Sequence, residues 1–175
     1  MAKADDARAG SAGRGAVLER VFDAPRELVF EAWTEPERLQ RWWGPKGYTV
    51  PYCEIDLREG GVFLYCMRSP EGRDFWGRGV FREIVVPERL VLAMSFADAG
   101  GNVVPATHHG LGPDWPLERL VTVTFEERAG ATRVAVRDGG VPPGPGGDGA
   151  RRGWAETLDG LADYLAMRER SPSAG

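Results

Sequence analysis

The stretch that decides the fold lies near the end of the chain: GWAETLDGLADYLAMR, residues 153–168. Its apolar residues recur at intervals of four, three and four, which places them on one face of an α-helix. They are Trp154, Leu158, Leu161 and Leu165. Such a stripe on an otherwise polar helix must pack against another apolar surface. We expect a helix over about 148–167 that covers the rest of the fold.

That apolar surface is predicted in the middle of the chain. From about residue 48 to residue 138, short runs rich in β-branched and aromatic residues alternate with turn signals, as in an antiparallel meander. Residues 98–117 form an unusually long connection, and connections of this length are often functional. The six predicted strands span about 48–57, 61–68, 74–85, 89–97, 118–128 and 131–138.

The start of the folded region predicts one more strand and two short helices. A strand at 16–22 leads into Asp23-Ala24-Pro25, which supplies a capping residue and a proline suited to a first helical turn. Thr34 and Glu37 have the spacing of a reciprocal capping box, and Gly44-Pro45 is expected to end the second helix. The whole order predicts an α+β domain whose curved antiparallel sheet wraps a long C-terminal helix.

Length and composition favour a single soluble domain. The 175 residues are 42% hydrophobic, and we expect one domain over 15–168 with disordered tails at 1–14 and 169–175. A net charge of -4 disfavours nucleic acid as a partner. No apolar run approaches the roughly 20 residues of a membrane span, and no signal peptide is recognisable. We therefore expect a cytoplasmic protein that does not bind membranes.

The sequence carries no motif that names a reaction. It has no phosphate-binding loop, nucleophile elbow, zinc-protease motif or CxxC pair, so we predict no catalytic residue, no metal site and no cofactor. His108 and His109 are the only histidines, and as neighbours in an extended loop they point to opposite sides. Glu54 and Asp56 share a strand face that is expected to meet solvent.

The two cysteines are predicted to be reduced and structural. If the turn at 58–61 has an even number of residues, Cys53 faces Cys66 on the neighbouring strand. A three-residue turn with a bulge would break that register. A redox pair stays the less favoured alternative to two small buried residues.

Two glycines on the last helix allow two interpretations. Gly153 and Gly160 are seven residues apart and share a face with Thr157 and Tyr164. A glycine in a helix interior costs about 1 kcal/mol relative to alanine, so it needs a structural reason. Either the helix lies very close to the sheet there, or it leaves space for a cavity lined by aromatic side chains.

The order of several short motifs resembles one known family. The motifs are D-A-P at 23–25, W-W-G-P at 42–45, D-L-R-E-G-G at 56–61, P-E-R-L-V at 87–91, T-R at 132–133 and the W-x-x-x-L-x-x-L helix from 154. Over about 16–166 the chain resembles the heat-shock-protein ATPase activator-homologue branch of the START-like (SRPBCC) superfamily. The resemblance implies the helix-grip fold, in which a curved sheet grips the C-terminal helix around an apolar cavity.

The resemblance leaves the function open, because such families include lipid and polyketide binders, aromatic cyclases, resistance proteins and chaperone-associated domains. Our leading hypothesis is a protein that binds an apolar, aromatic or polyketide-like small molecule between the sheet and the last helix. The alternatives are a natural-product biosynthesis or self-resistance protein acting on a reactive polyketide, and a chaperone-associated interaction module that no motif supports.

The predicted ligand-binding residues fall into three groups. One end of the cavity is closed by Trp33, Trp42 and Trp43. The interior is lined by Tyr65, Met67, Trp76, Met94, Phe96, Val123, Trp154, Thr157, Leu158 and Leu161. The long loop covers the entrance with His108 and Trp115.

Overall fold

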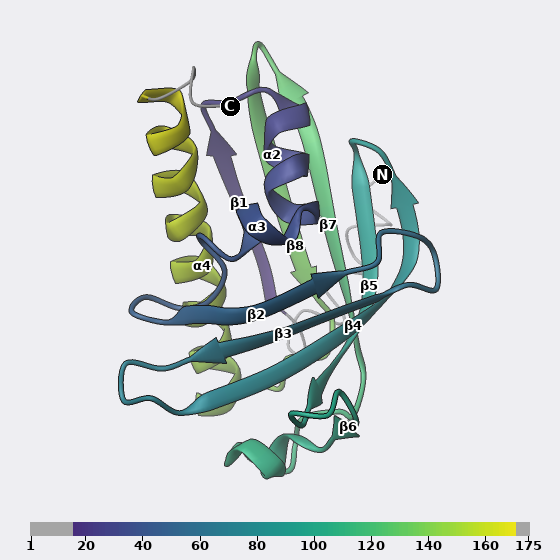
Figure 1. Ribbon diagram of the computed structural model, residues 1–175. Helices are drawn as coiled ribbons and strands as arrows, with labels where there is room; N and C mark the ends of the chain where they lie inside the picture. Colours follow the sequence, from purple (N-terminus) through teal and green to yellow (C-terminus); the bar gives the residue numbers. More distant parts are fainter. Residues whose placement is uncertain (1–15, 171–175) are drawn as a thin grey trace.

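The computed structural model describes residues 16–170, with side chains described up to Arg168 (Figure 1). The expected tail at 1–14, residue 15 at the start of the predicted domain, and residues 171–175 of the expected C-terminal tail lie outside these residues, whereas residues 169–170 of that tail belong to a helix. The strands are β1 (Ala16–Phe22), β2 (Thr49–Ile55), β3 (Val62–Arg68), β4 (Asp74–Val85), β5 (Arg89–Ala97), β6 (Val103–Val104), β7 (Arg119–Arg128) and β8 (Ala131–Asp138). The helices are α2 (Arg26–Thr34), α3 (Pro36–Leu39), the 3-10 turn η2 (Ala106–His109) and α4 (Pro145–Arg170).

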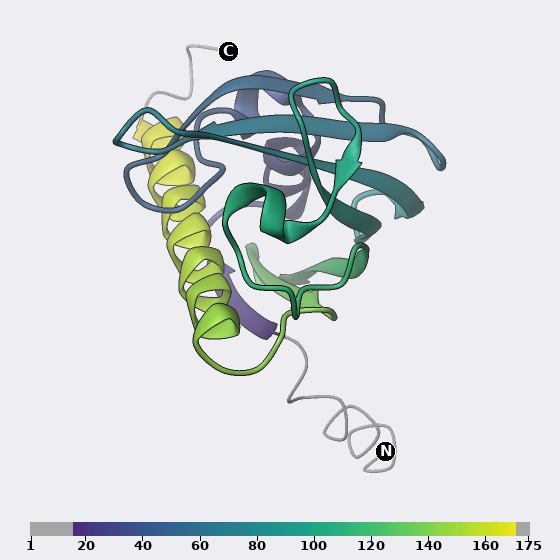
Figure 2. The same cartoon turned by 90° about the horizontal axis from the view of Figure 1, so that it is seen from below.

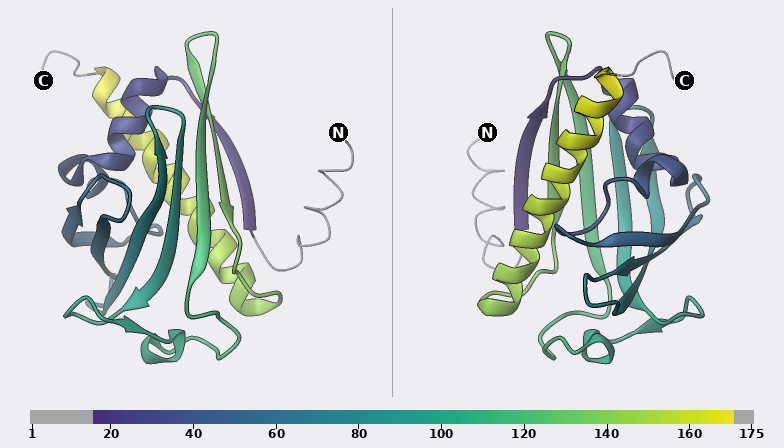
Figure 3. Two further views of the ribbon diagram at one scale, coloured as in Figure 1. Left: turned by 90° about the vertical axis from the view of Figure 1, so that its right-hand side faces the viewer. Right: turned by 60° about the vertical axis from the view of Figure 1, so that its left-hand side comes forward.

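One curved antiparallel sheet holds all eight strands, in the order β1-β8-β7-β5-β4-β3-β2, with β6 pairing to β5. Helix α4 runs along the concave side beside β1, and α2 and α3 cover the upper part of the same side (Figures 1 and 3). Seen from below, the segment between β5 and β7 crosses the opening between α4 and the sheet (Figure 2). The helix-grip fold predicted from the sequence is confirmed.

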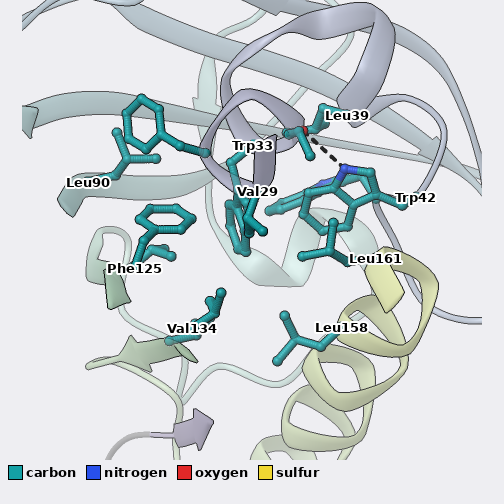
Figure 4. Packing of buried hydrophobic residues seen from close by; sticks show 14 of the residues in the cluster. Val29, Trp33, Leu39, Trp42, Leu90, Phe125, Val134, Leu158 and Leu161 are labelled. Carbon is teal, nitrogen blue, oxygen red and sulfur yellow. Dashed lines mark hydrogen bonds between the residues drawn. The ribbon is translucent and has the colours of Figure 1, made fainter. Parts of the chain in front are cut away.

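The apolar stripe of α4 supplies the middle of the core. Leu158 and Leu161 have no exposed surface, and Leu165 retains 7%. They face Phe125 and Val134 of the concave sheet, with α2 side chains between them (Figure 4). Burying a leucine side chain contributes about 1.5–3 kcal/mol, so this face holds the helix on the sheet.

Helix α4 is longer than predicted at both ends. It begins at Pro145, where proline fits a first helical turn, and it continues to Arg170. The start of the helix is rich in glycine, with Gly146, Gly147 and Gly149. A side chain at Gly147 would collide with the carbonyl oxygen of Pro142, so glycine here permits a tight approach of two backbone segments.

The predicted helix caps are wrong. Helix α2 continues through Thr34, whose hydroxyl donates to the Phe30 carbonyl oxygen (2.9 Å) rather than capping α3. Pro25 and Glu35 occupy the N-cap positions, and neither makes a side-chain capping bond. Because α3 ends at Leu39, Trp42 and Trp43 follow the helix instead of belonging to it.

The register of β2 against β3 differs from the even-turn prediction by one residue. Ile55 pairs with Phe63, which leaves an odd number of residues in the connection, and Cys53 pairs with Tyr65. Cys66 pairs with Tyr52 and Trp76, so the two cysteines lie on opposite faces. Both are free thiols. A redox pair between them is excluded by this geometry.

Candidate functional site

A small cavity lies inside the fold, between the concave face of the sheet and three tryptophans. Its volume is about 20 Å³, which is room for about one water molecule. The tryptophans are Trp33 from α2, Trp43 from the loop after α3, and Trp154 from α4. The remaining walls are apolar: Leu39, Phe63, Phe81, Leu90, Leu92, Met94, Val121 and Val123.

Trp43 is the centre of the aromatic cluster beside this cavity. Its ring centroid lies 5.8 Å from Trp33, 5.5 Å from Tyr65 and 5.7 Å from Trp154, each with an edge-to-face arrangement. Edge-to-face packing places the positive ring edge on the negative face of a neighbour. Trp154 also stacks on Trp33. Most of the space between helix and sheet is therefore filled by protein aromatic rings.

Two of the indole N–H groups in the cluster have a hydrogen-bond acceptor, and two do not. Trp42 Nε1 donates to the Ala32 carbonyl oxygen (3.0 Å; dashed in Figure 4), and Trp154 Nε1 donates to Asp138 (3.0 Å). Trp33 Nε1 and Trp43 Nε1 are buried and have no hydrogen-bond partner among the described residues. A buried donor without a partner costs about 1–3 kcal/mol. Both of these tryptophans line the cavity.

One end of the interior carries a buried ion pair. Arg119 Nε donates to both carboxylate oxygens of Asp138 (2.9 and 3.2 Å), and the two side chains are 12% and 1% exposed. The guanidinium also lies over the rings of Phe96 (5.4 Å) and Trp115 (5.2 Å). Ordered charges at this depth need mutual pairing, because desolvation costs several kcal/mol per ion. Asp138 therefore fixes both Arg119 and Trp154.

Tyr65 joins the polar end to the aromatic cluster. Its hydroxyl lies over Gly77, where a Cβ atom would come within 2.4 Å of Tyr65 Oη, so only glycine leaves room for it. Burial raises the pKa of the Tyr65 hydroxyl, and Asp138 raises it further, while the Arg119 charge and the nearby Trp43 indole lower it. The net effect is upward, so the hydroxyl is protonated at neutral pH and can donate.

The loop between β5 and β7 is held on the sheet by His109. His109 Nε2 donates to the Ala97 carbonyl oxygen (2.8 Å), while the His109 carbonyl oxygen accepts from Arg73 (2.6 Å). The ring also packs against Phe75 and Phe96. His109 is thus a packing residue. Among residues 16–170, no three histidine, cysteine or acidic side chains form a group that could hold a metal.

The structure brings some of the predicted site residues to the cavity and places others elsewhere. At the cavity wall are Trp33, Trp43, Met94, Val123 and Trp154. Packed around them, without lining the cavity, are Trp42, Tyr65, Met67, Leu158 and Leu161. Near the loop end are Phe96 and Trp115, in ring contact with each other, and His108, which is exposed. Thr157 is buried, and its hydroxyl donates to Gly153 within α4.

Trp76 lies on the other side of the sheet. It pairs with Cys66 and Ala97 in the ladder and contacts Tyr52 on the convex face. The prediction that Trp76 lines the interior is wrong, because side chains alternate along a strand and the inward positions of β4 are Gly77, Gly79 and Phe81.

Gly160 marks a close contact rather than a cavity. A Cβ atom there would lie 2.9 Å from the Trp42 carbonyl oxygen, whereas one at Gly153 would meet only Pro45 at 3.7 Å. Of the two interpretations of the helix glycines, close packing holds at Gly160, although the contact is with the loop after α3 and not with the sheet.

A second hollow opens on the surface beside that contact. It is a groove of about 440 Å³ between residues 40–48 and α4, with Glu156, Asp159 and Asp163 on the helix side. Trp43 lines both this groove and the interior cavity. Trp43 is thus a residue that the two hollows share.

Sequence reasoning missed the ion pair and part of the cavity wall. The unpredicted wall residues are Leu39, Phe63, Phe81, Leu90, Leu92 and Val121. Side chains alternate between the two faces of a strand, so most of these residues in β4, β5 and β7 could have been predicted once one inward-facing position of each strand was known. Arg119 and Asp138 stand at a strand start and a strand end, where charged residues are ordinary, so no pattern set them apart.

The comparisons with known proteins agree with this geometry. The model of the family "Activator of Hsp90 ATPase homolog 1-like protein" matches residues 23–166. The chain belongs to this family. Its START-like fold is known for ligand binding. A comparison with curated proteins finds no match.

Similar solved structures come from several bacteria. Protein NE0264 of Nitrosomonas europaea is 25% identical, with a TM-score of 0.71 and coverage of 91% of this chain and 98% of its own. An Arthrobacter aurescens protein is 24% identical, with a TM-score of 0.74 and coverage of 90% and 88%. The AHSA1-like protein of Aeromonas hydrophila is 23% identical, with a TM-score of 0.66 and coverage of 89% and 94%. These similarities support the fold.

In the described part of the chain, no helix combines the length and the apolar character needed to cross a bilayer.

Proposed function

We propose that this protein binds an apolar, aromatic small molecule in its interior, between the concave face of the sheet and α4. The observation that carries the proposal is the cavity behind Trp33, Trp43 and Trp154, with buried indole N–H groups at its wall that have no partner. Apolar walls with a few polar groups are typical of small-molecule sites.

Binding requires the cavity to enlarge. Even a benzene ring occupies an engineered cavity of about 150 Å³, far above the volume of about 20 Å³ present here. We expect displacement of the Trp43 side chain to enlarge the cavity, because Trp43 also lines the surface groove. Gly44 follows it with a φ of 105°, a conformation that glycine adopts without strain.

Filling the cavity tests the proposal. Val123→Ile adds one methylene at the cavity wall, and we expect unfolding free energy to hold or rise by about 0.5–2 kcal/mol while affinity for isopropylbenzene falls severalfold. Val134→Ile is the matched control, since Val134 is fully buried in the same core but does not line the cavity. Adding a methylene there overpacks the core and costs about 1–3 kcal/mol.

Ligand-observed NMR and urea denaturation on the two variants give both readouts. If isopropylbenzene and related aromatic probes do not bind the wild-type chain, the proposal fails. Natural-product chemistry or a chaperone-associated role would then become the leading hypothesis. If Val123→Ile binds isopropylbenzene as tightly as wild type, binding occurs outside this cavity.

A further inference from the structure

Two indole N–H groups at the cavity wall are donors that lack acceptors. Trp33 Nε1 and Trp43 Nε1 are buried without a hydrogen-bond partner. Beside the Trp43 indole lies the Tyr65 ring, at 5.5 Å between centroids, and its hydroxyl is protonated at neutral pH and can both donate and accept a hydrogen bond. Isolated donors in a dry interior are costly, and an acceptor on a bound molecule would remove that cost.

The carboxylate oxygens of Asp138, in the same region, are already engaged. Asp138 accepts from Arg119 through both oxygens and from Trp154, and it is 1% exposed. A ligand that offers only a donor would have to break one of these bonds or use the Tyr65 hydroxyl oxygen, and it would leave the Trp33 and Trp43 indole N–H groups without an acceptor. The site therefore favours a molecule with an acceptor over one with a donor.

The charges at this end cancel. Arg119 and Asp138 form a pair of opposite charges, so the interior offers no uncompensated positive charge to an anion. A ligand carboxylate would lose its hydration and lie near the Asp138 carboxylate, and both effects oppose binding. A neutral ligand oxygen has no charge to desolvate and is not repelled by the Asp138 carboxylate.

Building on the proposed function, we infer that the bound molecule is a neutral aromatic compound with a hydrogen-bond acceptor, such as an aryl ketone. Its oxygen accepts from the Trp43 indole N–H and the Tyr65 hydroxyl, while its ring occupies the enlarged apolar cavity. Trp33 offers a further indole N–H at the same wall.

Three probes of the same size separate the possibilities: isopropylbenzene, acetophenone and benzoate. We expect acetophenone to bind wild-type protein about three- to tenfold more tightly than isopropylbenzene, the range for one ordinary hydrogen bond, and benzoate to bind most weakly. Affinities come from ligand-observed NMR titrations on the full chain.

Two variants identify the donors: Tyr65→Phe removes only the hydroxyl, and Trp43→Phe removes the indole N–H by replacing the indole with a smaller phenyl ring. In Trp43→Phe and Tyr65→Phe, the preference for acetophenone over isopropylbenzene should fall about two- to tenfold, while an aromatic ring remains at each position. Trp76→Phe is the control, because Trp76 lies on the convex face. It should leave the preference within about twofold.

Each outcome decides the matter. If isopropylbenzene and acetophenone bind equally, the acceptor inference is overturned while interior binding stands. If benzoate binds most tightly, the site prefers anionic ligands and the inference is wrong. If no probe binds, the proposed function and this inference fall together.

Discussion

The two faces of strands β3 and β4 are built in opposite ways. On the concave face, Phe63 and Tyr65 of β3 pair with Gly79 and Gly77 of β4; the Tyr65 ring lies over Gly77, and the side chains of Met94 and Leu92 lie over Gly79. On the convex face, neither of the paired residues Cys66 and Trp76 is a glycine. The glycines leave space inside for rings arriving from other elements, such as Trp43.

The same contrast applies to charge. Arg119 and Asp138 form an ion pair on the concave side, almost removed from solvent, and Asp138 also holds Trp154. Arg68 and Asp74 form a pair with similar distances on the convex side, where both side chains are well exposed. The distances therefore do not show which pair matters more for stability. The free energy lost when a pair is broken depends on how deeply the pair is buried.

The largest expected effect comes from breaking the inner pair. Asp138→Ala leaves Arg119 charged and Trp154 without its acceptor in the interior, and we expect a loss of about 3–5 kcal/mol in unfolding free energy. Asp74→Ala should change stability little, because solvent replaces the lost partner. Urea denaturation of both variants gives the comparison. Equal losses would show that burial does not control these pairs.

The two glycines of α4 give the next largest effect. Gly160→Ala places a Cβ atom 2.9 Å from a backbone oxygen that cannot easily move, and we expect a cost of about 1–3 kcal/mol; Gly160→Leu should cost more. Gly153→Ala has ordinary room and should gain up to about 1 kcal/mol from helix propensity. If Gly160→Ala is as stable as Gly153→Ala, the close contact with Trp42 is not tight in solution.

The smallest effect concerns Cys53, whose side chain packs against the core from β2. Burial, with added repulsion from Glu37 and Glu54, raises the pKa of the Cys53 thiol from 9.0 to about 12. The folded state holds this proton more tightly than the unfolded state. The stabilising contribution is therefore complete below pH 9 and is lost as pH rises from about 9 to 12.

Alkylation and denaturation both test this. Cys53 in the folded chain should react with iodoacetamide far more slowly at pH 8 than after unfolding in urea. The stability difference between wild type and Cys53→Ala should shrink as the pH increases above 9. Rapid alkylation of folded protein at pH 8 would contradict the burial of this thiol.

Periodicity was sufficient to predict the fold. The stripe on α4 and the strand alternation depend on which residues are apolar, and both follow from burial on one side. The residues of the site were harder to predict, because they depend on which face of a strand each side chain occupies and on how neighbouring strands are aligned. An odd-length turn moved Cys53 opposite Tyr65, and the inward positions of β4 belong to glycines, which carry no apolar signal.

Polar contacts between residues far apart in the sequence could not be predicted either. The pair of Arg119 and Asp138 exists only because β7 and β8 lie together and α4 brings Trp154 to the same carboxylate. Nothing in the spacing of these three residues indicates that meeting. The long loop was correctly singled out, yet its anchoring through His109 depends on the position of Ala97 and Arg73.

The most direct measurement is a ¹H–¹⁵N spectrum of the six tryptophan indole groups during titration with acetophenone, assigned with single Trp→Phe variants. If the molecule binds inside, the signals of Trp33, Trp43 and Trp154 move, and that of Trp43 moves downfield as its N–H gains an acceptor, while Trp76 on the convex face stays in place. A spectrum in which Trp76 moves and the three interior signals do not would contradict the account.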